Sequence, residues 1–227
     1  MLNDRRLLCC AELCVGERAA DVGTDHGYLP VYLIEKGICS SAVACDINEM
    51  PLASARENIA RAGLSDKIET VLSDGLDSVP EEGITDVVIA GMGGELIADI
   101  IARAEWIKTN RVNLILQPMT KWDHLRRFLH ASGFNVIREL PCKEGRFVYS
   151  VMQAVYSGAG PEGECSLEYL YGGLVSGDTC EGAEYLERQA MRLEAVGRGI
   201  GRDAARSDEA EKYLSAAEAL RAKISTE

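Results

Sequence analysis

The chain has 227 residues, of which 47% are hydrophobic and 26% are charged. This length allows one main domain with an appendage, since domains average roughly 100–200 residues, and the composition is that of a globular protein with a substantial core. The formal net charge of −12 excludes a protein that coats nucleic acid through general positive charge.

Targeting and redox signals are weak in this sequence. No apolar run approaches the ~18 residues of a membrane helix, and the first residues lack the apolar core and cleavage site of a signal peptide. The eight cysteines form no C-x-x-C pair and no zinc-like spacing with histidine. We therefore expect a cytoplasmic protein with reduced thiols, no membrane association and no bound metal.

Strand and helix patterns alternate along the first 156 residues. After a short helix within residues 1–16, continuous apolar runs predict strands at 18–23, 41–47, 67–73, 85–91, 112–118, 135–141 and 146–156. Amphipathic patterns predict helices at 29–37, 51–63, 94–104 and 121–133. This alternation predicts a parallel sheet built from right-handed βαβ units, whereas the short connection before the last strand predicts an antiparallel pair.

The composition changes near Ser157, where a linker rich in glycine, proline and serine begins. Beyond it, apolar residues step by three and four along two segments, 186–200 and 213–224. This spacing predicts an antiparallel coiled-coil hairpin joined near Ser207–Asp208. Three glycines at 197, 199 and 201 weaken the first helix and suggest a bend or a frayed end. We expect two domains, 1–157 and 158–227.

Polar or glycine-rich residues follow each of the first five predicted strands, where parallel α/β sheets bind ligands. The first strand runs into the loop "DVGTDHG" (21–27), the second ends at Asp46, and the third ends at Asp74–Gly75. The fourth is followed by "GMGG" (91–94) and the fifth by Gln117. This convergence is the strongest functional signal in the sequence.

The first loop differs from a dinucleotide-binding loop. Asp21 and Asp25 flank its glycines in place of the G-x-G-x-x-G pattern. Carboxylates repel a pyrophosphate but suit a cationic amine, which favours S-adenosylmethionine over a nicotinamide cofactor. Asp46 could take the ribose hydroxyls, and Asp74 with the amide of Gly75 or Leu76 could hold the adenine edge. Each acid alone is also explained by a turn or helix-cap role.

Several segments together resemble the bacterial tRNA (adenine(22)-N1)-methyltransferase family: "DVGTDHGYLP", "ACDINEMPLASARENI", "SDGL", "VVIAGMGGELI" and "LILQPMT". The resemblance runs from about Arg5 to Tyr156 and implies a class I, Rossmann-like methyltransferase fold, with a seven-stranded, mostly parallel sheet and an antiparallel last strand. It implies methyl transfer from S-adenosylmethionine to N1 of an adenine in the tRNA D-loop. The sequence departs from the family at Gly27, usually alanine, and at Met119, usually asparagine beside the substrate pocket.

The fourth-strand motif narrows the reaction. "AGMGG" replaces the Asn/Asp-Pro-Pro-aromatic motif typical of methylation at exocyclic amino groups, whereas adenine N1 has an in-plane lone pair and needs only positioning and electrostatic stabilisation. As catalytic candidates, Asp25 would stabilise the cation or relay a proton, Tyr28 would stack on the base, and Gln117 would bond its edge. A loop-fixing role, a packed tyrosine and a strand-end cap are the respective structural alternatives.

The predicted cofactor-binding residues all lie at the same sheet edge. They are Asp21, Gly23, Thr24, Asp25, His26, Asp46, Ile47, Asp74, Gly75, Leu76, Gly91 and Met92. His26 is expected mainly to fix the loop, and Met92 to line the methyl-donor pocket.

A basic stretch between residues 106 and 147 holds eight lysines and arginines against three acids. The RNA-binding candidates are Arg5, Arg6, Lys121, Arg126, Arg127, Lys143 and Arg146. Arg188 and Arg192 recur at helical spacing and could extend this surface, although residues 158–227 carry eight bases against fourteen acids. A solvated surface without RNA remains the alternative.

Three functions are compatible with these patterns. The first is a tRNA adenine-N1 methyltransferase acting as a monomer on tRNA. The second is a methyltransferase for a small molecule or protein, and the third is a non-catalytic RNA- or partner-binding protein with the same fold. A nicotinamide dehydrogenase is disfavoured because the glycine fingerprint is missing.

Overall fold

The computed structural model describes residues 2–158 and 163–224, so the predicted linker lies partly outside the described residues. Within these residues the sheet has seven strands: β1 (Arg18–Val22), β2 (Ser41–Asp46), β3 (Ile68–Leu72), β4 (Asp86–Gly93), β5 (Asn113–Thr120), β6 (Phe134–Glu144) and β7 (Phe147–Tyr156). All seven predicted strands are therefore present, each within a few residues of its expected bounds.

The strand order in the sheet is β3-β2-β1-β4-β5-β7-β6. β1 to β5 pair in parallel, whereas β7 is antiparallel to both β5 and β6. Gly145, in the tight turn between β6 and β7, has a φ of +57°, a conformation that suits glycine. The prediction of a mostly parallel sheet with an antiparallel last strand is confirmed.

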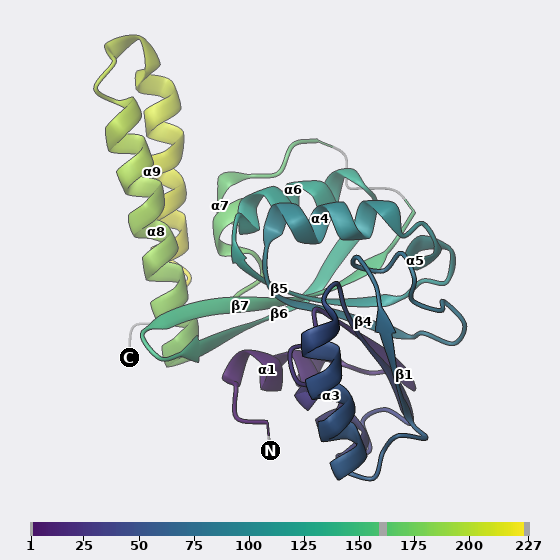
Figure 1. Cartoon of the computed structure of the whole chain (residues 1–227). Coiled ribbons are helices and arrows are strands. Elements are labelled where there is room, and N and C mark those ends of the chain that lie inside the picture. The colour runs from purple at the N-terminus through teal and green to yellow at the C-terminus, as the bar shows by residue number, and fades with distance from the viewer. Residues whose placement is uncertain (1, 159–162, 225–227) are drawn as a thin grey trace.

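Two helical layers cover the sheet (Figure 1). One contains α1 (Arg5–Leu13), α2 (Tyr28–Glu35) and α3 (Glu49–Arg61); the other contains α4 (Gly94–Arg103), the short and unpredicted α5 (Trp106–Thr109), and α6 (Trp122–Ala131). Along β4, Val87 and Ile89 pack into the α4–α6 layer while Val88 packs into the α1–α3 layer. Burial on both faces explains why the strands read as continuous apolar runs.

The C-terminal helices form a hairpin that extends away from the sheet (Figure 1). A short helix that the sequence did not predict, α7 (Leu167–Gly172), precedes α8 (Cys180–Ile200), a 3-10 turn (Ala204–Arg206) and α9 (Ser207–Arg221). Leu186 and Leu193 of α8 pack with Ala217 and Leu220 of α9. The predicted helix pair is confirmed, but residues 201–206 join it, and its coiled-coil geometry stays a prediction.

Gly197 has a packing role instead of marking the predicted bend. α8 continues past it to Ile200. A Cβ added at Gly197 would lie 3.1 Å from both the Ala210 carbonyl oxygen and the Tyr213 Cβ. The glycine therefore lets α9 approach α8 closely near the tip of the hairpin, which offsets its intrinsic cost in a helix.

Arg126 ties the C-terminal helices to the sheet, and its predicted contact with RNA is wrong. The residue is 0% exposed. Its guanidinium pairs with Glu139 of β6, and it donates to the Leu170 carbonyl (2.8 Å) and to the Tyr185 hydroxyl (3.1 Å). Burial alone would lower the pKa of Arg126, but the Glu139 carboxylate more than offsets this and raises it. The side chain is thus a buried connector without access to a ligand.

Candidate active site

The loop after β1 folds back onto β2 and forms one wall of a pocket. The amides of Gly23 and Thr24 both donate to the Cys45 carbonyl, at 2.8 and 2.9 Å. Gly23 has a φ of +79°, which allows the chain to turn directly after the strand. The resulting loop pocket has a volume of about 620 Å³ and is lined by Leu2, Asn3, Asp4, Arg6, Leu7, Asp21, Gly23, Thr24, Asp25, His26, Tyr28, Leu29, Ala90 and Gly91.

Asp21 is the electrostatic centre of the loop pocket. It is only 7% exposed, and within residues 2–158 and 163–224 no lysine or arginine forms an ion pair with it. Burial raises its pKa to about 6, and the nearby Asp46 carboxylate adds to the rise. A buried carboxylate in this state is suited to a ligand that brings a positive charge.

Asp25, His26 and Tyr28 form the outer rim of the loop pocket. The Asp25 side chain is 81% exposed, and its carboxylate lies 3.3 Å from Nε2 of His26. The His26 and Tyr28 rings are 5.3 Å apart in a tilted arrangement. Tyr28 starts α2, yet its ring is partly open to solvent. All three side chains are therefore accessible to a molecule that enters the pocket.

The ends of β2 and β3 hold the other predicted cofactor residues, which lie outside the lining of the loop pocket. Oδ1 of Asp46 accepts from the Asn48 amide (2.7 Å), so the carboxylate caps its own turn. Asp74 pairs with Arg103 at 3.0 Å, an exposed contact that a ligand could replace. Ile47 is exposed and Leu76 is buried. Gly75 packs against Ile100, 2.9 Å from the position of an added Cβ.

Gln117 shapes the edge between β4 and β5. It is 0% exposed; its Oε1 accepts from the Gly91 amide (3.1 Å), and its Nε2 donates to the Pro118 carbonyl (3.1 Å). Of its two predicted roles, the structure places Gln117 in that of a strand-end cap. Met92 packs against Gly23, since a Cβ added there would lie 2.4 Å from the Met92 methyl carbon.

Gly93 and Gly94, where β4 ends and α4 begins, test the packing at this edge. A Cβ added at Gly94 would lie 2.2 Å from the Lys121 carbonyl oxygen, whereas one at Gly93 would meet nothing closer than 3.4 Å. We expect Gly94→Ala to lower the free energy of unfolding by about 2–3 kcal/mol, because the backbone at Lys121 must move to make room for the added methyl group. Gly93→Ala, the matched control, should change it by less than about 1 kcal/mol. Urea unfolding measures both, and equal losses would contradict the packing argument.

The remaining predicted RNA contacts lie in different surroundings. Arg5 and Arg127 are exposed. Lys121 is 3.9 Å from Glu95, and Lys143 is 2.6 Å from Glu184. All four cations are on the surface, and the exposed Arg146 guanidinium lies 4.9 Å from the centre of the Phe147 ring.

Arg6 differs from these cations because it lines the loop pocket. It pairs with Asp4 at 2.6 Å, which raises the pKa of the guanidinium, and its Nη1 donates to Sδ of Met119 at 3.1 Å. Met119, where the sequence departs from the family pattern, therefore contacts a residue that lines the loop pocket.

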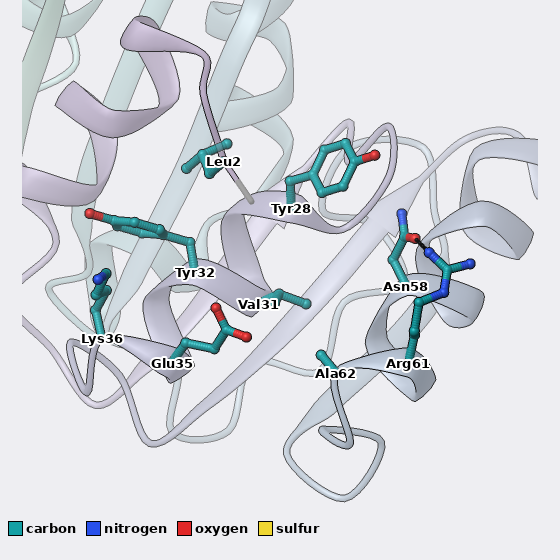
Figure 2. A pocket seen from close by; sticks show the side chains of 9 residues that line it. All are labelled: Leu2, Tyr28, Val31, Tyr32, Glu35, Lys36, Asn58, Arg61 and Ala62. Atoms are coloured by element: carbon teal, nitrogen blue, oxygen red, sulfur yellow. Dashed lines mark hydrogen bonds between the residues drawn. The ribbon is translucent and has the colours of Figure 1, made fainter.

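A second groove, which the sequence did not reveal, lies beside the loop pocket between α2 and α3 (Figure 2). It shares Leu2 and Tyr28 with the loop pocket. Arg61 donates to Asn58 (2.9 Å), and Asn58 in turn donates to the His26 carbonyl (3.0 Å). These residues lie outside the basic stretch at 106–147, so only their i, i+3 spacing on one helix could have indicated them.

In the described part of the chain, residues 2–158 and 163–224, no group of three or more histidines, cysteines or acids is placed to hold a metal ion. The helices of that part are also too short or too polar to cross a bilayer.

The strand order of the sheet is that of a Rossmann-like methyltransferase fold. The acidic loop after β1 lines the loop pocket at the edge of this sheet. A family model described as a methyltransferase domain matches residues 3–152. The chain belongs to this methyltransferase domain family.

Individual relatives agree with the resemblance predicted from the sequence. The chain is 34% identical over 139 residues to the tRNA (adenine(22)-N(1))-methyltransferase of Bacillus subtilis, and the match spans 61% of this chain and 58% of that enzyme. The crystal structure of the B. subtilis m1A22 tRNA methyltransferase aligns with a TM-score of 0.82 at 25% identity, covering 97% of this chain and 99% of the other. A Streptococcus pneumoniae protein solved with S-adenosyl-L-methionine aligns with a TM-score of 0.79 at 28% identity, covering 97% and 100%.

Proposed function

We propose that the protein transfers a methyl group from S-adenosylmethionine to N1 of an adenosine in tRNA, at position 22 of the D-loop. The observation that carries the proposal is the buried Asp21 carboxylate, whose pKa is raised to about 6 and which faces a pocket of about 620 Å³. The family and the named activity of the B. subtilis relative support the choice of reaction.

The residues of the sheet edge fit this methyl donor. Asp21 lacks a cation, and the α-ammonium of S-adenosylmethionine supplies one. Asp46, at the end of β2, is in the position that binds ribose hydroxyls in such folds. Ile47, Gly75 and Leu76 would enclose the adenine ring, with Asp74 turning from Arg103 to its amino group.

The chain's own residues then orient the substrate and stabilise charge. When bound, the cofactor supplies an electrophilic methyl group on a sulfonium, which becomes a neutral thioether as the N1–CH3 bond forms and the adenine becomes cationic. Asp25, at the open rim, is placed to stabilise that cation. Tyr28 stacks on the base, and Gln117 contributes indirectly by holding the Gly91 backbone that lines the pocket.

We assign RNA binding to cations around this edge: Arg5, Lys121, Arg127, Lys143 and Arg146, which are exposed, and Arg6, which is half-buried. The acidic chain requires such a local patch, because phosphate contacts supply most of the affinity for nucleic acid. We further propose a cytoplasmic monomer with a methyltransferase domain at 1–157 and a helical hairpin domain at 158–227.

One experiment tests the whole proposal. The protein is incubated with methyl-labelled S-adenosylmethionine and an unmodified tRNA transcript, which is then digested to nucleosides. We expect label in N1-methyladenosine, and none when A22 of the transcript is replaced by guanosine. Cofactor binding without any RNA methylation would instead favour a small-molecule or protein substrate, and absence of cofactor binding would favour a non-catalytic protein.

Asp25→Ala tests the electrostatic role separately. We expect turnover to fall about tenfold to a hundredfold, because the substitution removes a negative charge placed to face the developing cation. The affinity for tRNA should change less than about threefold, since a carboxylate does not attract phosphate. Single-turnover methylation and fluorescence anisotropy measure the two quantities, with the exposed Asp66→Ala as control. Equal losses in both would remove Asp25 from catalysis.

A further inference from the structure

A second pocket lies where the hairpin meets the methyltransferase domain. This junction pocket has a volume of about 600 Å³ and is enclosed by the β5–α6 connection, β7 and α8. Its aromatic lining residues are Trp122, Phe147, Tyr149 and Tyr185. Its cationic lining residues are Lys121, Arg188 and Arg192, against Asp123 as the lining acid. Aromatic rings together with a net positive charge are the features that bind single-stranded nucleic acid.

Arg192 is held in this pocket without an opposite charge. Its guanidinium lies 4.4 Å from the centre of the Trp122 ring, and its Nη1 donates to the neutral Gln189 amide oxygen at 3.2 Å. Among the described residues no carboxylate lies within ion-pair distance of it. Although the residue has exposed surface, burial of the guanidinium against the indole lowers its pKa, and the nearby Arg188 adds to this.

Trp122 adds a second unsatisfied donor. Its indole Nε1 is buried and has no hydrogen-bond partner within the described part of the chain. A buried N–H without an acceptor destabilises the folded chain. The pocket therefore presents the unpaired Arg192 cation, which an anionic oxygen would satisfy, beside an indole whose buried N–H has no partner among the described residues.

The junction pocket is next to the loop pocket. Arg6 lines the loop pocket and contacts both Met119, through its Nη1 at 3.1 Å, and the Tyr149 ring, at 5.9 Å from its centre. Met119 and Tyr149 line the junction pocket. A strand whose base enters the loop pocket could thus continue past Arg6 into the junction pocket.

We propose that the junction pocket binds a nucleotide of the tRNA next to the methylated adenosine. Arg192 binds its phosphate, and its base packs against Tyr149 and Phe147. This inference rests on the proposed function. An RNA strand fits better than an acidic protein segment because the pocket joins the site where the adenine reacts and offers several aromatic rings for a base.

The test compares Arg192→Gln with Arg198→Gln, a matched variant six residues further along the same helix. Arg198 is 75% exposed and pairs with Glu194 outside the pocket. Binding of unmodified tRNA is followed by anisotropy at several salt concentrations, and S-adenosylmethionine binding by calorimetry. We expect Arg192→Gln to weaken tRNA binding about tenfold and to reduce the salt slope by about one. Cofactor affinity should stay within twofold, and Arg198→Gln should match the wild type.

The outcomes separate the two proposals. If the wild type binds and methylates tRNA but Arg192→Gln binds it as tightly as Arg198→Gln, the junction pocket is not an RNA site and the proposed function stands. If the wild type itself does not bind tRNA, both fail. Rescue of affinity and salt slope by Arg192→Lys would support a phosphate contact.

Discussion

Asp21→Asn should stabilise the protein without its cofactor at neutral pH and at the same time strongly weaken S-adenosylmethionine binding. The Asp21 carboxylate is buried, and its pKa is about 6 in the folded chain against 3.8 for the free side chain. Keeping it ionised at pH 7 therefore opposes folding by roughly 2–3 kcal/mol, since one pKa unit corresponds to about 1.4 kcal/mol. An uncharged amide of the same shape removes this cost.

The contribution of Asp21 to the free energy of unfolding depends on pH. Because the folded pKa is raised, the native state binds the proton more tightly than the unfolded chain between pH 3.8 and about 6. The contribution of Asp21 to stability is therefore fully present below pH 3.8 and is lost as the pH rises through about 6. The advantage of Asp21→Asn should be largest at pH 7 and above, and should shrink towards pH 4.

Urea unfolding at pH 5 and 7.5 measures this difference, and calorimetry measures cofactor binding. We expect the affinity for S-adenosylmethionine to fall at least about thirtyfold, because a buried ammonium without its partner is strongly disfavoured. Asp66 is an exposed carboxylate in the loop before β3. As the control, Asp66→Asn should change neither the stability nor the affinity for the cofactor. A variant that is less stable at pH 7.5 yet binds the cofactor normally would show that Asp21 is a structural acid.

Much of the fold could be predicted because its signals are local. Val87, Val88 and Ile89 are consecutive apolar residues since both faces of the sheet are covered. The acid loop at 21–27 could also be predicted, because every parallel strand delivers its following residues to the same edge.

Other features depend on long-range contacts that a sequence does not display. Arg126 reads as one more cation in a basic stretch, but Glu139, 13 residues away, and Leu170, 44 residues away, bury it. Gln117 follows a strand like the other site residues, yet it turns inward to Gly91. Gly197 weakens a helix in isolation and is required only once α9 is beside it.

Arg126→Met should lower the free energy of unfolding by about 3–5 kcal/mol, because it leaves the Glu139 carboxylate buried without its partner. Both side chains of this pair are fully buried. The loss arises less from the attraction itself than from the uncompensated charge that remains. The matched surface pair, Arg138 with Glu12 at 2.8 Å, has side chains that are half exposed, so Arg138→Met should cost less than about 1 kcal/mol.

The double variant Arg126→Met/Glu139→Gln separates the two contributions. Glutamine keeps an oxygen for the Leu174 amide, which donates to Glu139 Oε2 at 2.9 Å, but it removes the buried charge. We therefore expect the double variant to regain about 1–2 kcal/mol relative to Arg126→Met, measured by urea unfolding as a double-mutant cycle. If the two single losses simply add, the pair is not coupled, and the hairpin is held to the sheet by the hydrogen bonds of Arg126 to Leu170 and Tyr185 instead of by its charge.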